Sequence, residues 1–292
     1  MKNKAWMSEL SDSLRLTQIN MPGTHDSACR YLDFSFISQT QHLSVTDQLN
    51  IGVRYFDFRF KFYKSKFITN HSICYCRKKF GFWNEILLAD DIVRECIAFL
   101  RENPTETILF QLKEAESNAG NDFYNEFYKK YIADCLDLWF LSNRIPTISE
   151  ARGKIVLLRA VSVDAERFTD ENCGIDFTSY PYVGSYNVDD WKRGEIRKLS
   201  GEKYAGMYVQ DSYKSEGMHK WGTVTRFLAS GLSDDDFNIC LTSCTRVFVP
   251  RFNAPKINKL LKQYNFAKGR LYGIIATDFI DDEICEKIIN SN

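Results

Sequence analysis

Residues 53–60 read Val-Arg-Tyr-Phe-Asp-Phe-Arg-Phe, and this stretch predicts a strand with two unlike faces. Because side chains alternate along a strand, the phenylalanines share one face with Arg54, while Asp57 and Arg59 share the other. The aromatic face needs a layer of helices to cover it, so we expect Asp57 and Arg59 to point into the inside of a barrel. A purely structural ion pair is the alternative interpretation of these two charges.

Short runs of β-branched and aromatic residues predict seven further strands. They lie at 17–21, 66–70, 106–112, 154–159, 206–211, 238–243 and 272–279. Apolar residues three and four apart predict helices over 90–100, 122–138 and 256–265. The alternation predicts an α/β fold: one domain, residues 1–292, forming a distorted or incompletely closed (β/α)8 barrel of the TIM type. Few helix signals lie between Asp164 and Lys203, so the wall is expected to be irregular there.

Composition excludes several classes of protein. The 38 basic and 38 acidic residues cancel, which argues against a nucleic-acid partner. Nine cysteines without a Cys-x-x-Cys pair are typical of free thiols, and whether Cys74 and Cys76 pair stays open. No signal peptide or membrane span is visible, so we expect a protein that is cytoplasmic, or secreted with its leader removed. We also expect a monomer.

Polar side chains gather at the predicted carboxyl ends of strands, where such barrels carry their chemistry. His25 and Asp26 follow the first strand in Met-Pro-Gly-Thr-His-Asp-Ser (21–27), and His71 follows the third. Two of only four histidines thus reach neighbouring strand ends beside Asp57 and Arg59. The later strands end in Lys113, Arg159, Asp211 with Tyr213 close behind, Ser243 and Asp278, each of which could also be a surface residue at the start of a loop.

Two histidines, one acting as base and one as acid, and an arginine that stabilises phosphate charge suit phosphoryl transfer without a metal or other cofactor. No Gly-x-Ser-x-Gly motif supplies a nucleophile. A hydroxyl of the substrate itself is then the expected nucleophile, which favours an internal displacement that forms a cyclic phosphate.

An ordered series of motifs resembles the catalytic X region of bacterial phosphatidylinositol-specific phospholipase C. The series comprises residues 21–27, Gly-Val-Arg-Tyr-Phe-Asp-Phe-Arg at 52–59, His71, Asn-Pro-Thr-Glu-Thr-Ile at 103–108, Arg-Gly-Lys-Ile-Val-Leu-Leu at 152–158, Gln-Asp-Ser-Tyr at 210–213 and Asp278. It covers nearly the whole chain. The resemblance implies cleavage of phosphatidylinositol, or a related inositol phosphodiester, to diacylglycerol and inositol 1,2-cyclic phosphate.

The resemblance also implies roles for the matching residues. His25 becomes the general base toward the inositol 2-hydroxyl, oriented by Asp278, and His71 becomes the general acid, supported by Asp26. Positions that hold the inositol ring in the family match Lys113, Arg159, Asp211 and Tyr213, and Tyr213 is expected to stack on the ring. Ser243 is a further candidate for substrate binding.

Arg59 and Asp57 match the family's phosphate-stabilising arginine and its neighbouring aspartate. The eukaryotic branch holds calcium with acidic residues where this sequence has Arg59, so the resemblance implies a metal-independent enzyme. The family's His-Gly is His71-Ser72 here, followed by Ile-Cys-Tyr-Cys, so we expect a differently shaped leaving-group side.

The expected partner is an inositol phospholipid substrate. We also expect the protein to contact a membrane surface peripherally. Exposed apolar candidates for this contact are Phe34, Phe36, Ile37, Val247, Phe248, Val249 and Phe252, for which core packing is the alternative. Two other functions stay open: a metal-dependent barrel like the glycerophosphodiesterases or sphingomyelinase D, and a catalytically inactive barrel that binds inositol lipids.

Overall fold

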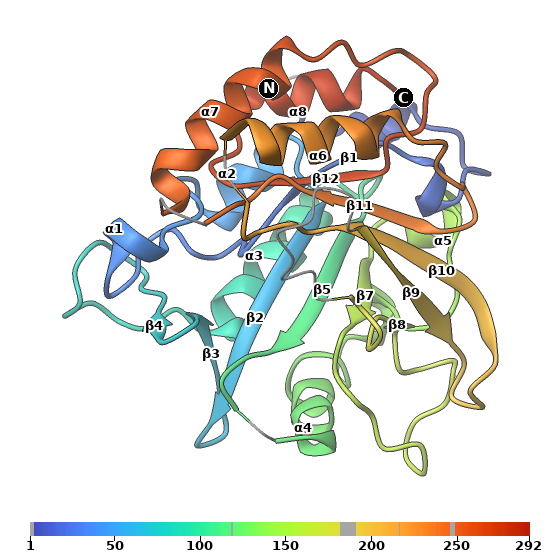
Figure 1. The fold of residues 1–292 in the computed structure, drawn as a ribbon. Coiled ribbons are helices and arrows are strands. Elements are labelled where there is room, and N and C mark those ends of the chain that lie inside the picture. Colours follow the sequence, from blue (N-terminus) through green and yellow to red (C-terminus); the bar gives the residue numbers. More distant parts are fainter. Residues whose placement is uncertain (1–2, 118, 182–190, 216, 246–248) are drawn as a thin grey trace.

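The computed structural model describes residues 3–117, 119–181, 191–215, 217–245 and 249–292 (Figure 1). Parallel strands form the wall of a barrel, in the order β6-β7-β5-β2-β1-β12-β11-β10. These strands are β1 (Met21–Thr24), β2 (Tyr55–Tyr63), β5 (Ile108–Glu114), β6 (Trp139–Phe140), β7 (Ile155–Arg159), β10 (Lys203–Gln210), β11 (Phe237–Leu241) and β12 (Ile274–Thr277). β8 (Ile175–Asp176) pairs in parallel with β7.

The barrel does not close through a strand pair in the part of the chain that the structure describes. β8 pairs only with β7, and β9 (Trp191–Arg197) runs antiparallel to β10. Side chains bridge the gap instead: the Ser179 hydroxyl accepts from the backbone N–H of Glu195 at 2.7 Å, and Asn143 Nδ2 donates to the carbonyl of Arg197 at 2.8 Å. The expected incompletely closed barrel is confirmed, and its irregular side lies within the stretch from 164 to 203.

Helices cover the outside of this sheet (Figure 1). They are α1 (Ser35–Ser38), α2 (Val45–Asn50), α3 (Ala89–Glu102), α4 (Asn121–Tyr131), α5 (Ile148–Ala151), α6 (Gly217–Ala229), α7 (Pro250–Gln263) and α8 (Asp282–Ile289). Short 3₁₀ helices occupy Trp6–Glu9, Leu16–Gln18 and Leu136–Leu138. No helix among the described residues is long and apolar enough to span a bilayer.

The faces of β2 follow the predicted alternation. Phe56, Phe58 and Phe60 are fully buried in the outer core between the sheet and the helices, where Phe58 packs 4.5 Å from the ring of Phe110. Tyr55 belongs to a separate inner core, and Asp57 shares its face inside the barrel. Binary patterning of one strand therefore predicted which charges enter the barrel.

Two strand predictions are wrong in position or direction. The first strand begins at Met21, because residues Leu16–Gln18 form a 3₁₀ turn before it. The third, β3 (Lys66–His71), is no barrel strand: it returns antiparallel along β2 and then pairs with β4 (Cys74–Tyr75). The reason is a two-residue turn in which Lys64 and Ser65 adopt φ of 47° and 58°, the left-handed geometry of a tight hairpin.

Two predicted helices have different bounds. α4 ends at Tyr131 rather than near 138, and a separate 3₁₀ turn follows it. α7 begins at Pro250, before the predicted start at 256, because proline fits the first position of a helix and Pro255 is tolerated in the next turn.

Candidate active site

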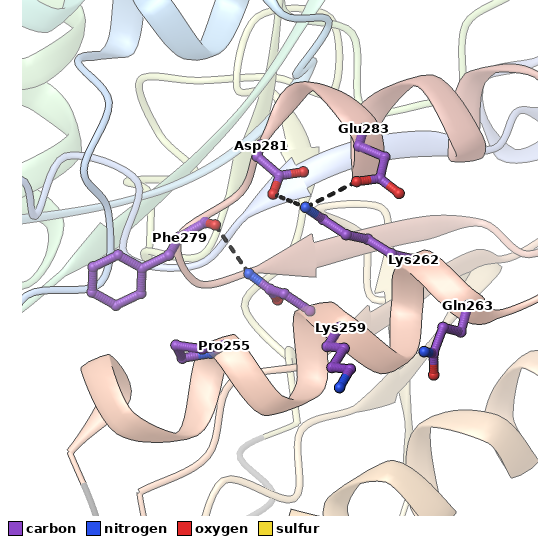
Figure 2. Close-up of a pocket in the computed structure, with 8 residues that line it drawn as sticks. Pro255, Lys259, Lys262, Gln263, Phe279, Asp281 and Glu283 are labelled. Carbon is purple, nitrogen blue, oxygen red and sulfur yellow. Dashed lines mark hydrogen bonds and ion pairs between the residues drawn. The ribbon is translucent and has the colours of Figure 1, made fainter.

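Two of the cavities on the described surface are compared with the predicted site residues. One lies between α7 and the start of α8, where Lys262 Nζ is held 2.5 Å from Asp281 and 3.1 Å from Glu283 (Figure 2). It holds none of the predicted site residues. The other, of about 550 Å³, opens at the carboxyl ends of the barrel strands. The predicted residues that line it are His25, Arg59, His71, Lys113, Asp211, Tyr213 and Ser243.

The register of β1 against β12 brings His25 beside Asp278. Thr24 pairs with Thr277, so the residues that follow them emerge as neighbours, and Nδ1 of His25 lies 2.9 Å from Oδ1 of Asp278. On its other side, β1 lies close to β2 because residue 23 is glycine: a Cβ there would lie 2.8 Å from the ring of Tyr55. The carboxylate can only accept, so Nδ1 carries a proton and Nε2, on the other side of the ring, faces Asp26.

Asp26 lies between the two imidazoles. Its Oδ2 is 3.3 Å from Nε2 of His25 and 3.4 Å from Nε2 of His71, while its Oδ1 is 2.8 Å from Nε of Arg59. The backbone of Asp26 is left-handed, with φ of 41°, a conformation that aspartate tolerates. Thr40 Oγ1 holds it by donating to the Asp26 carbonyl at 2.9 Å.

Electrostatics in this cluster favour a protonated His25. Burial opposes its charge, but Asp26 and Asp278 outweigh burial and raise the pKa of His25 to about 9. Burial also opposes the charge of Asp26, yet Arg59 and the two histidines hold the pKa of Asp26 below its usual value. Nearby opposite charges thus offset the cost of burial for both groups.

His71 reaches the same cavity along the hairpin β2–β3. Its Nδ1 donates to the carbonyl of Ser38 at 2.8 Å, which leaves Nε2 directed at Asp26. The next residue, Ser72, has φ of 52°, a geometry that glycine adopts at lower cost. A differently shaped leaving-group side after His71 stays a prediction.

Arg59 and Lys113 are adjacent across the pair β2–β5 and share Asp57. Arg59 Nη2 lies 2.8 Å from Asp57 Oδ2, and Lys113 Nζ lies 3.0 Å from Asp57 Oδ1. Burial disfavours the charge of Asp57, but these two cations hold its pKa well below the usual range. Asp57 therefore does more than form one structural ion pair with Arg59, as the alternative interpretation had it. It holds two cations, Arg59 and Lys113, at one wall of the cavity.

A purely structural ion pair does occur in this barrel, at a different place. Arg54 Nη2 lies 2.7 Å from Glu106 Oε2, both side chains are fully buried, and neither lines the cavity. Arg54 follows the outer face as predicted, but its guanidinium is satisfied by Glu106 and backbone carbonyls.

Arg159 does not reach the cavity, although sequence reasoning included it among the ring-holding residues. In β7, Ile155 and Leu157 belong to the outer core and Val156 and Leu158 to the inner core, so Arg159 follows the outer face. Its guanidinium donates to the carbonyls of Cys173 and Val161 and lies 3.4 Å from Asp176. Ala160 lines the cavity in its place.

The remaining wall was missed by sequence reasoning. Phe177, Thr178 and Tyr180 line the cavity beyond β8, and the ammonium of Lys113 sits 4.3 Å above the ring of Tyr180. The stretch after Asp164 shows neither strand nor helix periodicity, so no pattern predicted which of its side chains turn inward. Asp211, Tyr213 and Ser243 line the cavity after β10 and β11.

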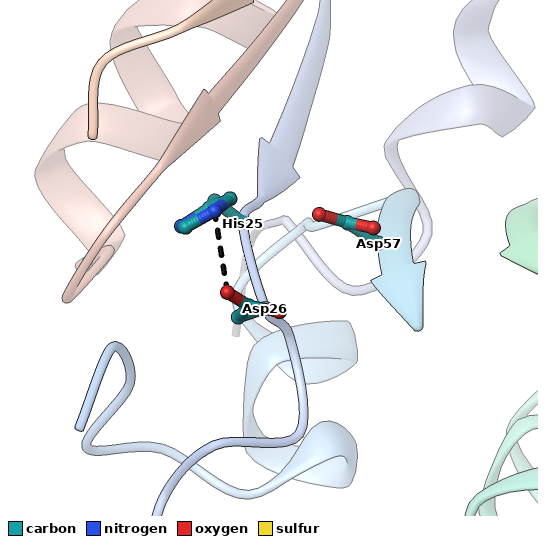
Figure 3. Close-up of side chains that lie close together, drawn as sticks. All are labelled: His25, Asp26 and Asp57. Atoms are coloured by element: carbon teal, nitrogen blue, oxygen red, sulfur yellow. Dashed lines mark ion pairs between the residues drawn. The ribbon is translucent and has the colours of Figure 1, made fainter. Parts of the chain in front are cut away.

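His25, Asp26 and Asp57 are close enough to be weighed as metal ligands (Figure 3). Arg59, however, places nitrogen atoms 2.8 Å from both carboxylates, and Lys113 lies 3.0 Å from Asp57. A divalent cation would have to compete with two fixed cations for the same oxygens, so this donor set does not fit a resident metal.

The sequence and the fold both match known proteins. The family model PI-PLC X 1 matches residues 13–136. The 1-phosphatidylinositol phosphodiesterase of Listeria monocytogenes is 26% identical over 308 residues, covering 99% of this chain and 85% of that protein. The Staphylococcus aureus (strain Newman) protein of the same name is also 26% identical, covering 98% of this chain and 93% of its own length.

Solved structures agree with these matches. A variant of the S. aureus phosphatidylinositol-specific phospholipase C superposes with a TM-score of 0.76 at 22% identity, covering 99% of this chain and 98% of that one. The Listeria enzyme gives 0.74 at 23% identity over 99% and 98%. This chain is a relative of the bacterial phosphatidylinositol-specific phospholipases C. The resemblance stated from the sequence motifs is thereby confirmed, and so is the TIM-type barrel.

Within this phospholipase fold, the cluster around Asp26 lies at the carboxyl ends of β1, β2 and β12, the part of the barrel that carries chemistry in related architectures. Asp57 and Asp278 sit behind the cavity wall and contact the residues that line it. That the whole chain is one domain stays a prediction.

Proposed function

We propose that this chain cleaves phosphatidylinositol, or a related inositol phosphodiester, to diacylglycerol and inositol 1,2-cyclic phosphate without a metal. The observation that carries the proposal is one cavity in which two imidazoles share Asp26 beside a fixed guanidinium. The names of the bacterial relatives support the substrate, since those proteins are 1-phosphatidylinositol phosphodiesterases.

His25 is the proposed general base. Its Nε2 takes the proton of the inositol 2-hydroxyl as that oxygen attacks phosphorus. Asp278, 2.9 Å from Nδ1, orients the ring and stabilises the imidazolium that forms. The same carboxylate raises the pKa of His25 to about 9 together with Asp26, so the free base is scarce at neutral pH and more abundant in mild alkali.

His71 is the proposed general acid. As the bond between phosphorus and the diacylglycerol oxygen breaks, Nε2 of His71 gives its proton to that oxygen, so that neutral diacylglycerol leaves. The Ser38 carbonyl fixes the ring through Nδ1, and Nε2 lies 3.4 Å from Oδ2 of Asp26. The 2-hydroxyl proton now rests on His25. The site resets when His25 releases this proton to solvent and His71 takes up another.

Arg59 is the proposed partner of the phosphate oxygens. Two carboxylates hold its guanidinium at the cavity wall, so little reorganisation is needed as negative charge develops. Lys113, Asp211, Tyr213 and Ser243 line the rest of the cavity and are the proposed contacts of the inositol hydroxyls, with Tyr180 added to them by the structure.

Contact with a lipid surface is part of the same proposal. Phe34, Phe36, Ile37 and Phe252 leave between 48% and 61% of their surface exposed, and the rings of Phe36 and Phe252 meet at 5.7 Å. Val249 is half-buried at the N-terminal end of α7, while Val247 and Phe248 lie outside the described residues. Membrane binding has been studied for the S. aureus enzyme, which supports this contact.

A second apolar segment, missed by sequence reasoning, extends the surface. After His71 the chain exposes Ile73, Phe80, Phe82 and Trp83, each with at least 70% of its surface accessible. This segment and α1 project from the same side of the barrel (Figure 1). The ring centroids of Tyr31 and Phe80 are 6.4 Å apart, in an edge-to-face arrangement. Exposed aromatic groups beside a lipid-cleaving site suit insertion into the bilayer interface.

The decisive assay follows phosphorus by NMR with EDTA present. Vesicles of phosphatidylinositol are expected to yield inositol 1,2-cyclic phosphate before any open-chain phosphate. A soluble glycerophosphoinositol in a parallel reaction separates a lipid enzyme from a soluble-substrate enzyme. Absence of product from both substrates would leave the inactive lipid-binding barrel as the better interpretation, and dependence on an added metal would favour the glycerophosphodiesterase-like one.

A further inference from the structure

Three cysteines form part of a small core cluster behind the candidate active site and have no part in the proposed chemistry. Cys29, Cys74 and Cys76 are buried together with Leu32. The sulfur atoms of Cys29 and Cys76 are 3.4 Å apart, although the two residues are separated by 47 positions in the sequence. The pairing left open by the sequence, Cys74 with Cys76, is therefore not the one that the fold favours.

We propose that Cys29 and Cys76 form a disulfide when the chain meets an oxidising thiol–disulfide couple, and that this bond staples the two segments that carry the histidines. Cys29 lies three residues after Asp26, and its backbone N–H donates to the Asp26 carbonyl at 3.0 Å. Cys76 donates through its backbone to Thr69 of β3, two residues before His71, at 2.9 Å. The cross-link would thus join the turn of His25 to the strand of His71.

Geometry selects this pair over the alternatives within the cluster. Cys74 and Cys76 lie on one face of the same extended segment, about 6.6 Å apart along it, which exceeds the Cβ separation that a disulfide allows. Cys74 is also engaged elsewhere, since it accepts a hydrogen bond from the Ser38 hydroxyl at 3.2 Å. No cluster of metal-ligating groups among the described residues includes these three cysteines, which argues against a metal site.

The reaction balances with a small disulfide such as oxidised glutathione as the oxidant. The thiolate of one cysteine attacks the glutathione disulfide and releases one glutathione. The second cysteine then attacks the mixed disulfide and releases the other, so two thiols of the protein are oxidised and two molecules of reduced glutathione form. Burial and the neighbouring Cys76 raise the pKa of the Cys29 thiol, so we expect exchange mainly during folding or local opening, after which the bond is shielded.

The test maps thiols in the full chain after refolding with oxidised and reduced glutathione. Free thiols are blocked with N-ethylmaleimide, and the chain is digested without reduction. We expect a cross-linked peptide containing Cys29 and Cys76, and seven rather than nine blocked cysteines, since nine minus the two paired residues leaves seven. Because the bond closes a long loop, adding reductant should lower the Tm by about 5–10 °C.

Variants provide the controls. Cys76→Ala should abolish both the cross-linked peptide and the effect of reductant on Tm, whereas Cys135→Ala, which removes a thiol outside the cluster, should keep both. Mapping of the parent chain decides the question if Cys76→Ala fails to fold. Nine blocked cysteines after oxidative refolding, or a cross-link that joins Cys29 to Cys74, would overturn the proposal. The readouts do not depend on the proposed function.

Discussion

Nδ1 of His25 lies 2.9 Å from Oδ1 of Asp278, a contact set by the register of β1 against β12. Replacing Asp278 with asparagine keeps the shape but removes the charge that orients the ring. We expect a loss of about 10²–10⁴ in kcat. The acid limb of kcat/KM should also move to lower pH, because the carboxylate helps to raise the pKa of His25 to about 9.

The measurement is a profile of kcat/KM against pH on a soluble inositol phosphodiester, for the parent and for Asp278→Asn. A base with a raised pKa becomes active as it loses its proton, so the parent rate should climb as pH approaches about 9. An unshifted acid limb in the variant would mean that Asp278 does not tune His25.

The two histidines are predicted to be individually indispensable. His25→Ala and His71→Ala should each lose about two to four decades of rate, while circular dichroism and Tm show that the fold survives. His219 is an exposed histidine on α6 outside the cavity, so His219→Ala is the matched control and should be fully active. Near-parental activity of either site variant would rule out the two-histidine mechanism.

Arg59 is predicted to replace a metal. Lysine keeps the charge but cannot donate two parallel hydrogen bonds, so Arg59→Lys should lose about 3 kcal/mol or more of transition-state stabilisation with a smaller change in KM. EDTA should leave the parent unchanged. If chelation abolished activity and calcium or magnesium restored it, the assignment of Arg59 would fail.

Arg159 and Lys113 should behave as opposites despite their similar positions at strand ends. Arg159→Met leaves two buried carbonyls without their donor and removes the ion pair with Asp176, so unfolding free energy should fall by about 2–4 kcal/mol while KM stays near the parental value. Lys113→Met changes a residue that lines the cavity and should raise KM or lower kcat. Urea unfolding and steady-state kinetics separate the two effects, and a large rise in KM for Arg159→Met would return Arg159 to the site.

Membrane contact is tested by replacing Phe36 and Phe252 with serine together. Sedimentation with phosphatidylinositol vesicles should show weaker binding by about tenfold, because two exposed rings no longer enter the interface. Activity on a soluble substrate should be unchanged. Leu136→Ser removes a half-exposed apolar side chain elsewhere and serves as the control. Equal vesicle binding of all three proteins would point to a soluble substrate.

Sequence periodicity predicted the parts of this molecule that are regular. The inward face of β2, the helix at α3 and the strand-end positions of His25 and Lys113 all follow from alternation and helical spacing. The same rule, applied to β7, would have turned Arg159 outward, since Leu158 and Ala160 share the inner face. Arg159 was nevertheless predicted to line the site, because the motif resemblance was given more weight than the alternation of side chains along the strand.

Other features depend on contacts between distant segments, which one strand at a time cannot indicate. The sequence around Asp26 does not indicate that its carboxylate lies near both histidines. His71 belongs to a hairpin 45 residues further along the chain (71 minus 26). Tyr180 comes from a stretch without periodicity, and its place above Lys113 is set by the open side of the barrel. The approach of Cys29 to Cys76 is equally non-local.

His71 lies on a hairpin beside the barrel, whereas His25 and Arg59 depend on the barrel strands themselves. These two parts of the fold differ in how well they tolerate insertions. His25 directly follows β1 and Arg59 lies in β2, both in the barrel wall, and a change of register there would disturb the whole core. β3 only flanks the wall. Insertions at the tip of the β2–β3 hairpin, or in the exposed apolar segment that contains Ile73 and Trp83, would therefore leave the wall intact. Under the proposed roles, the side of the site that meets the lipid leaving group could therefore change by insertion while the strands that carry the inositol side keep their register.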